Sequence, residues 1–330
     1  MANCRIAPTL MHFTSMRTAV SFLLHPSPLI LSLMLPCTPP APLQPGDLLR
    51  VIVPSGTLRE MESFHKGVEV WRSHGYRVEV PPNFDKRWGY LAGTDQERRS
   101  QLYDAWNDPD CRGIVCARGG YGATRLLEDW QWPTVAPKWL IGFSDITGLL
   151  WSLGQQQISA LHAPVLTTLG VEPAWSIARL FDWVQAGSLP PLKGIGWGGG
   201  RTRGILLPGN LTVATHLLHT PFQPSLDGVI LALEDVSEAP YRIDRMLTYW
   251  RTCGIFKQVN GIALGRFSQC DAPPNVPSFP VEGVLRDRLA DLGLPIVSDL
   301  PFGHDGSNAC LPVGIPVYLD GDQGMLGLEP

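Results

Sequence analysis

The sequence predicts an α/β protein with two structured domains, and three observations support this fold class. Strand-like and helix-like segments alternate from Asp47 to about residue 165, a spacing typical of a parallel sheet covered by helices on both faces. Residues 204–330 instead contain short apolar strands separated by turns. Residues 166–203 finish in a glycine-rich stretch. We therefore expect an α/β domain over residues 46–165, a linker region over 166–203 and a smaller β-rich domain, with the character of a small barrel, over 204–330.

The elements of the first domain follow from their apolar patterns. "LLRVIVPSG" predicts a buried strand, residues 59–74 a helix that ends before Gly75, and "YRVEVPP" a second strand. Thr94, with Glu97 three residues later, predicts a helix that begins with a capping box. "CRGIVCARGGYG" and "KWLIGFSD" predict two further strands, and "GVILALEDV", "VNGIALGRF" and "PIVSDLP" predict strands of the second domain.

The first 45 residues differ from the rest of the chain. Their apolar stretch is broken at His25-Pro26-Ser27-Pro28, and neither side of the break is long enough to span a membrane. A weak signal peptide is the alternative, since Arg17 precedes the apolar part, and Met11, Met16 and Met34 could each be the true start. We expect residues 1–45 to be a disordered or mis-annotated extension, and no membrane association.

Composition narrows the class of protein. The chain has 330 residues, of which 44% are hydrophobic, and a net charge of -4, so it lacks the basic character of a nucleic-acid-binding protein. Its seven cysteines include no C-x-x-C pair, which argues against a zinc site and favours a reducing compartment. Small molecules or peptides are the expected partners.

Ser144 and Asp145 lie where an apolar strand meets an apolar helix. Both residue types cap helices, because their side-chain oxygens accept hydrogen bonds from N–H groups of the first turn. The other interpretation is a nucleophilic serine exposed on a tight strand-to-helix turn, although Ile146 stands where the G-x-S-x-G motif has its second glycine. The segment alone leaves both interpretations open.

A glycine-rich loop, Gly119 to Gly122, follows the preceding strand and should share one cleft with Ser144, because ligands bind at the carboxyl ends of parallel strands. Its N–H groups could hold a phosphate or stabilise an oxyanion. The spacing matches neither the dinucleotide fingerprint nor the P-loop. A nucleotide-binding enzyme therefore remains a minor alternative.

Two more residues could carry chemistry. His304 lies in a loop between Gly303 and Gly306, as either a turn histidine or a general base. Glu234 directly follows an apolar strand, either as a solvated strand end in a local charge network or as a functional carboxylate. With Ser144 they could form a hydrolytic triad, since a serine needs a base and a carboxylate can orient an imidazole. His216 and His219 share a helical face without a third ligand, so no metal site is indicated.

Several long blocks, in order from about Pro45, together resemble one known family. They are "PGDLLRVIVPSG", "ARGGYGATRLL", "IGFSDITGLLWSL", "LALEDVSEAPYRIDRML", "GIALGRFSQC" and "PFGHDGSNACLPVG". The chain is similar to the LD-carboxypeptidases, serine peptidases that include murein tetrapeptide carboxypeptidases and microcin C immunity hydrolases. The resemblance implies a flavodoxin-like N-terminal domain, a small β-rich C-terminal domain of swivelling-barrel type, a homodimer, a cytoplasmic location and no metal or organic cofactor.

By motif, the resemblance also implies a Ser144-His304-Glu234 triad, with an oxyanion hole formed by the backbone N–H groups of Gly120 and Asp145. The expected reaction is hydrolysis of an L,D-peptide bond that releases D-alanine from a murein tetrapeptide. Three candidates for substrate binding, two of them cations that could face the free carboxylate, are Tyr121, Arg118 and Arg242.

Two other functions remain open at this point. A microcin C-type hydrolase would cleave an aminoacyl-nucleotide linkage, but only 90 positions separate residues 144 and 234, which leaves little room for an added aromatic loop, although Trp197 lies in that interval. A non-catalytic two-lobed binding protein would use Ser144 only as a helix cap.

Overall fold

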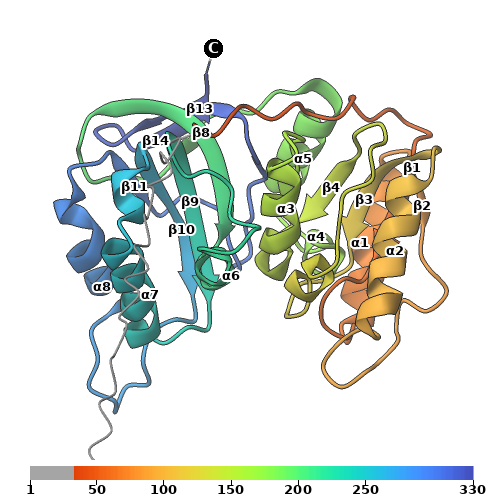
Figure 1. Cartoon of the computed structure of the whole chain (residues 1–330), viewed down its shortest axis with the longest axis horizontal. Coiled ribbons are helices and arrows are strands. Elements are labelled where there is room, and N and C mark those ends of the chain that lie inside the picture. The colour runs from red at the N-terminus through yellow and green to blue at the C-terminus, as the bar shows by residue number, and fades with distance from the viewer. Residues whose placement is uncertain (1–32, 330) are drawn as a thin grey trace, which may run out of the picture. The chain divides into compact units, whose positions relative to one another are not determined.

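The computed structural model describes residues 33–329, and its first sheet has six strands (Figure 1). The spatial order is β12-β5-β4-β3-β1-β2, in which β1 to β5 are parallel and β12 is antiparallel to β5. The order 2-1-3-4-5 of the parallel strands is that of flavodoxin-like folds, which confirms the predicted class of this domain. The strands are β1 Leu48–Ile52, β2 Arg77–Glu79, β3 Cys111–Cys116, β4 Trp139–Gly142, β5 Leu161–His162 and β12 Leu311–Pro312.

Helices cover both faces of this sheet and bury apolar side chains against it. On one face lie α1 (Met61–Ser73), α4 (Leu166–Leu169) and α5 (Ala174–Ala186). On the other lie α2 (Asp95–Asn107) and α3 (Thr147–Gly154), with the short 3-10 helices η1 (Thr124–Leu127) and η2 (Ser144–Ile146). The capping box predicted at the start of α2 is confirmed, since Thr94 and Glu97 exchange both of its hydrogen bonds.

The second sheet has eight strands in the order β6-β14-β13-β8-β9-β10-β11-β7. Its two edge strands, β6 and β7, are separated in the chain by Gly194 alone, so the sheet must curl until its edges approach each other. The strands are β6 Leu192–Lys193, β7 Ile195–Gly196, β8 Arg201–Asn210, β9 Val229–Val236, β10 Gly261–Ser268, β11 Ile296–Ser298, β13 Pro316–Asp320 and β14 Met325–Leu328. The associated helices are α6 Leu211–Leu217, α7 Pro240–Thr252, α8 Val281–Leu289, η3 Ile255–Lys257 and η4 Ala290–Leu292.

The expected linker, residues 166–203, is built into the fold. It contains α4, α5, β6 and β7, and Leu180 and Val184 of α5 are fully buried against the first sheet. Strand β12 also returns from the C-terminal region to pair with β5, so the chain does not divide cleanly at residue 203.

Part of the expected extension is also ordered. Cys37 and Thr38 donate backbone hydrogen bonds of 2.8 Å to Gly314 and Gln157, and Leu43 is fully buried. Residues 33–45 therefore belong to the packed structure, whereas residues 1–32, which carry the rest of that expectation, lie outside the described residues.

The two sheets share one apolar core. Trp151 of α3 is fully buried in the same cluster as Leu207 of β8 and Leu231 of β9, and its indole N–H donates to the Pro208 carbonyl at 2.9 Å. Across residues 33–329, no helix combines the length and apolarity needed to cross a membrane, and no three His, Cys, Asp or Glu side chains are grouped as metal ligands would be.

Candidate active site

Ser144 occupies a strained turn directly after β4. Its backbone φ is 64°, in the left-handed region that non-glycine residues seldom adopt and that is costly unless the surroundings enforce it. Neither η2 nor α3 receives a hydrogen bond from a capping side chain. The helix-cap interpretation of Ser144 is therefore wrong, and the turn has the strained form of a nucleophile elbow.

The loop after β3 lies directly against this serine. A Cβ atom added to Gly119 would come within 3.0 Å of the Ser144 Cβ and 3.1 Å of its Oγ, so only glycine allows the two loops to approach this closely. The Gly119 carbonyl in turn accepts a hydrogen bond from the Gly56 N–H at 3.3 Å, which joins the loop after β1 to the same group.

His304 and Glu234 form a hydrogen-bonded pair. The imidazole Nδ1 lies 2.6 Å from Glu234 Oε2, although 70 positions separate the two residues in the chain. Glu234 is fully buried within β9, so its interpretation as a solvated strand end is wrong. The Nδ1 contact leaves Nε2 as the atom that could act as a base.

The contact between His304 and Glu234, together with their burial, changes the pKa of both groups. Burial lowers the pKa of His304, but the hydrogen bond and charge of Glu234, with Asp235 and Asp305, outweigh that effect and leave the pKa raised. Burial raises the pKa of the Glu234 carboxyl, and the hydrogen bond with His304 partly opposes the rise. The imidazolium is thus stabilised by its carboxylate partner, which is what proton abstraction from a serine requires.

Asn210 also holds the Glu234 carboxylate, and Asp235 and Thr212 hold Asn210 in place. Asn210 Nδ2 donates to Glu234 Oε1 at 3.3 Å and to Asp235 Oδ1 at 3.0 Å, and Asn210 also caps α6 through Val213 N–H. The other oxygen of Asp235 accepts from Thr212 N–H at 2.9 Å and from its hydroxyl at 2.7 Å. Glu234 is therefore restrained on both oxygens.

The histidine ring lies beside the Ser144 turn. Its centroid is 4.6 Å from that of Phe143, the residue that precedes Ser144. The loop that carries it is tied down by Asn308, which accepts from Gly303 N–H at 3.1 Å and donates its own N–H to Glu172 at 2.9 Å. His162 packs on the same phenylalanine, and burial lowers its pKa to about 3, so it is neutral near pH 7.

Gly120 and Asp145 face one cavity. Within residues 33–329, neither of their backbone N–H groups donates a hydrogen bond to another residue. Both residues line a cavity of about 560 Å³ between η1 and α6, together with Tyr121, Val213 and Phe222. The Asp145 side chain does not face this cavity as its backbone does. Its carboxylate is buried and accepts a hydrogen bond from the Ala123 N–H at 2.8 Å. Burial raises its pKa.

The three candidates for substrate binding differ in position. Tyr121 lines the cavity and is 53% exposed. Arg118 is partly buried and already bonds the Thr57 carbonyl at 2.6 Å and Glu60 at 3.2 Å. Arg242, on α7, is exposed and pairs with Glu238 at 3.4 Å. Both arginines therefore have carboxylate partners before any substrate binds.

Sequence reasoning missed several residues at the site. Asn210 precedes an apolar helical run, so its cap could have been predicted, but its contact with Glu234 arises only when β8 and β9 pair. No sequence pattern pointed to the packing of Phe143 on His304 or to the arginines of α2, because those contacts join distant segments.

The comparisons with known proteins define the family. The LD-carboxypeptidase N-terminal domain model matches residues 49–163 and the LD-carboxypeptidase C-terminal domain model matches residues 203–319. The chain is 60% identical over 288 residues to a Synechocystis sp. protein provisionally named a carboxypeptidase, covering 87% of this chain and 96% of that protein. It is 31% identical over 301 residues to the murein tetrapeptide carboxypeptidase of Pseudomonas aeruginosa, covering 84% and 92%.

Solved structures agree on the fold. The muramoyltetrapeptide carboxypeptidase of Oxalobacter formigenes matches with a TM-score of 0.76 and 29% identity, over 84% of this chain and 97% of that one. MccF in complex with glutamyl sulfamoyl guanosine matches with a TM-score of 0.79 and 20% identity, over 88% and 98%. The chain therefore belongs to the LD-carboxypeptidase family and is a serine peptidase.

Proposed function

We propose that the protein is an LD-carboxypeptidase that releases D-alanine from murein tetrapeptides, with Ser144, His304 and Glu234 as its triad. The observation that carries this proposal is the 2.6 Å contact between His304 Nδ1 and buried Glu234, beside the strained Ser144 turn. A packed histidine whose Nδ1 is held by a carboxylate, so that Nε2 can accept a proton, is the arrangement that activates a serine.

The reaction follows from these groups. Nε2 of His304 removes the Ser144 proton as Oγ attacks the scissile carbonyl carbon, and Glu234 stabilises the imidazolium that forms. The N–H groups of Gly120 and Asp145 receive the oxyanion of the tetrahedral intermediate, and losing one such donor typically costs about 10²–10³ in turnover. His304 then protonates the leaving amine of D-alanine. Water hydrolyses the acyl-serine through the same groups.

Relatives support the murein substrate over the aminoacyl-nucleotide alternative. The murein tetrapeptide carboxypeptidase is 31% identical to the chain, whereas the microcin C7 self-immunity protein of Escherichia coli is 25% identical. Trp197, the aromatic candidate for stacking on a nucleoside, already packs under Arg286 at 4.6 Å and donates to Ser298 Oγ at 2.8 Å. Arg286 therefore already stacks on one face of this indole, and the hydrogen bond to Ser298 fixes its orientation.

We further propose, as the resemblance to LD-carboxypeptidases implies, that the protein is a homodimer, lies in the cytoplasm and acts in cell-wall recycling.

The Ser144→Ala variant tests the proposed function. Wild-type protein should release D-alanine from a murein tetrapeptide and should be labelled by a fluorophosphonate, and the variant should do neither while keeping its melting temperature. Activity of the variant at the wild-type rate would refute the nucleophile. If the wild-type protein instead hydrolyses an aminoacyl-nucleotide and releases no D-alanine, the immunity-type reaction is favoured.

A further inference from the structure

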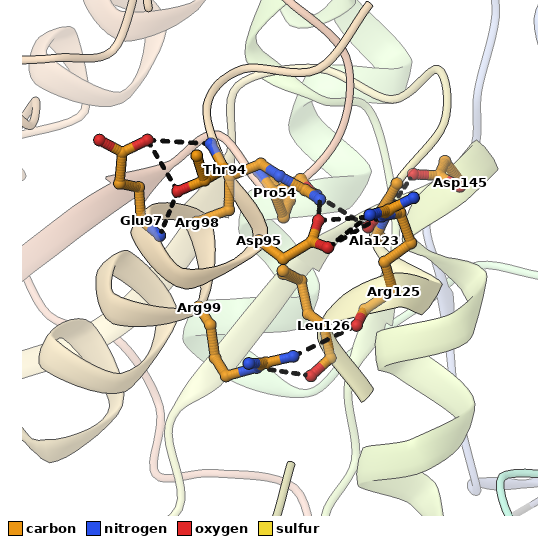
Figure 2. A network of polar contacts seen from close by, with 11 residues as sticks. Pro54, Thr94, Asp95, Glu97, Arg98, Arg99, Ala123, Arg125, Leu126 and Asp145 are labelled. Atoms are coloured by element: carbon orange, nitrogen blue, oxygen red, sulfur yellow. Dashed lines mark hydrogen bonds and ion pairs between the residues drawn. The ribbon is translucent and has the colours of Figure 1, made fainter. Parts of the chain in front are cut away.

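Three loops meet at the carboxyl ends of β1, β3 and β4, and a buried arginine from α2 joins two of them. Arg98 has no exposed surface, and its Nη1 donates to the carbonyl of Pro54, after β1, and to the carbonyl of Gly122, after β3, at 2.7 Å. Figure 2 shows this guanidinium between the two loops. One side chain therefore sets the separation of the loop after β1 from the loop that carries Gly120.

The fit around Arg98 is close. Gly122 has a φ of 123°, and a Cβ there would lie 2.9 Å from Arg98 Nη1 and 2.5 Å from Leu91 Cδ2. The next residue, Ala123, donates its N–H to the Asp145 carboxylate at 2.8 Å. The loop after β3 is thus held on one side by Arg98 and on the other by the residue that follows the nucleophile.

Asp95 fixes the position of this arginine. Its carboxylate pairs with Arg98 Nη2 and also with Arg125, whose Nε and Nη2 lie 2.9 and 2.6 Å from its oxygens (Figure 2). Arg99 extends the network by donating to the Leu126 carbonyl at 3.1 Å. These side chains from one turn of α2 hold both ends of the segment between Gly122 and Leu126.

Burial of this arginine has an electrostatic cost. Burial lowers the pKa of Arg98, and the hydrogen bond and charge of Asp95 oppose that shift. The hydrogen bond from Arg125 holds the pKa of Asp95 below its ordinary value, against the effect of burial. A charged side chain this deep is costly unless its partners are well placed, and two of its partners here are carbonyls of the loops that form the site.

We propose that Arg98 is a positioning residue that, with Asp95, sets the geometry of the oxyanion hole by fixing the loop that carries Gly120 relative to Ser144. This inference rests on the proposed function. Arg98 itself contacts no substrate. Its contribution should appear in the transition state, because an oxyanion donor displaced by a fraction of an ångström stabilises the developing charge less while substrate still binds.

The experiment compares Arg98→Met, Arg98→Lys and Asp95→Asn with Lys138→Met. Lys138 is a matched control, because it is also a buried cation that donates to two carbonyls, Asp108 and Cys111, but at the amino ends of β3 and β4. For each variant, kcat and KM for D-alanine release, the second-order rate of fluorophosphonate labelling and the melting temperature are measured.

We expect Arg98→Met to lower kcat and the labelling rate about 100-fold, near the cost of losing one oxyanion donor, with KM little changed. Arg98→Lys and Asp95→Asn should each lower kcat and the labelling rate about tenfold, because the lysine keeps one of the carbonyl contacts and the asparagine keeps the arginine in place. Lys138→Met should lower the melting temperature comparably while keeping kcat within about twofold. If Arg98→Met does not fold, the two milder variants decide.

The proposal is overturned if Arg98→Lys and Asp95→Asn both keep wild-type kcat, or if all variants lose kcat in proportion to their melting temperatures. Failure of the proposed function is a separate result. That failure would be seen first, in two results: the wild-type protein would release no D-alanine, and the Ser144→Ala variant would still be labelled by the fluorophosphonate.

Discussion

His304 Nδ1 lies 2.6 Å from Oε2 of Glu234, and that carboxylate has no exposed surface. A buried carboxylate is stabilised mainly by its specific partners, so its contact with the imidazole is worth more here than it would be in water. The pair therefore governs both the position of the histidine and the pH range over which it can act as a base.

Glu234→Gln should lower kcat by about 10³–10⁴ with little change in fold, because an amide can hold the ring but cannot stabilise the imidazolium. The carboxylate also raises the pKa of His304. The acid limb of kcat/KM should therefore move to lower pH in the variant. A pH-rate profile checks this, and an acid limb at unchanged pH would contradict the assignment of Glu234 as partner of the base.

The stability that the His304–Glu234 pair contributes and the catalytic activity should change in opposite directions as pH rises. Because the folded-state pKa of His304 is raised, its pair with Glu234 contributes stability that is fully present below the ordinary pKa, about 6.5, and is lost as pH rises through the folded value. Activity instead rises over that window, since the base must be neutral. The melting-temperature difference between wild type and His304→Gln should narrow as pH increases. A difference that widens would disprove the coupling.

Gly119→Ala should impair catalysis more than stability. The new Cβ would lie 3.0 Å from the Ser144 Cβ and 3.1 Å from Oγ, so Ser144 or the loop must shift. We expect kcat to fall at least about tenfold, because small displacements of reacting groups are costly. Gly283→Ala, in the first turn of α8, is the control: its new Cβ would lie 3.3 Å from the Pro280 Cγ, far along the chain from Ser144, and the substitution should leave kcat unchanged. Equal kcat in the two variants would argue against the close approach.

Ser144→Gly should be more stable than Ser144→Ala. The φ of 64° at this position carries the strain of a left-handed conformation, which glycine adopts freely and alanine does not. We expect the glycine variant to exceed the alanine variant by about 0.5–1 kcal/mol in the free energy of unfolding, with both inactive. Chemical denaturation measures the difference. An alanine variant of equal or higher stability would mean that the turn relaxes without strain.

Local patterns were sufficient to predict the elements from β1 to β4 in order, but not β5 or the return of β12 to the same sheet. The alternation of apolar residues identified β1, β3 and β4, and the Thr94 and Glu97 pair identified the start of α2, because these signals depend on residues a few positions apart. The same reasoning misassigned residues 166–203 as a linker, since apolar positions such as Leu180 and Val184 are buried only by packing against α1 and the sheet.

The sequence by itself predicted the fold class from local patterns, and its resemblance to the LD-carboxypeptidases gave the family and the candidate residues Ser144, Glu234 and His304. Only the tertiary structure decided what those residues do to one another. The pairing of distant strands buries Glu234 and brings it into contact with an imidazole 70 positions away. It also places Arg98 where it donates hydrogen bonds to two loops. No window of sequence contains both partners of such a contact, so its distance and its effect on pKa exist only once the sheets have formed.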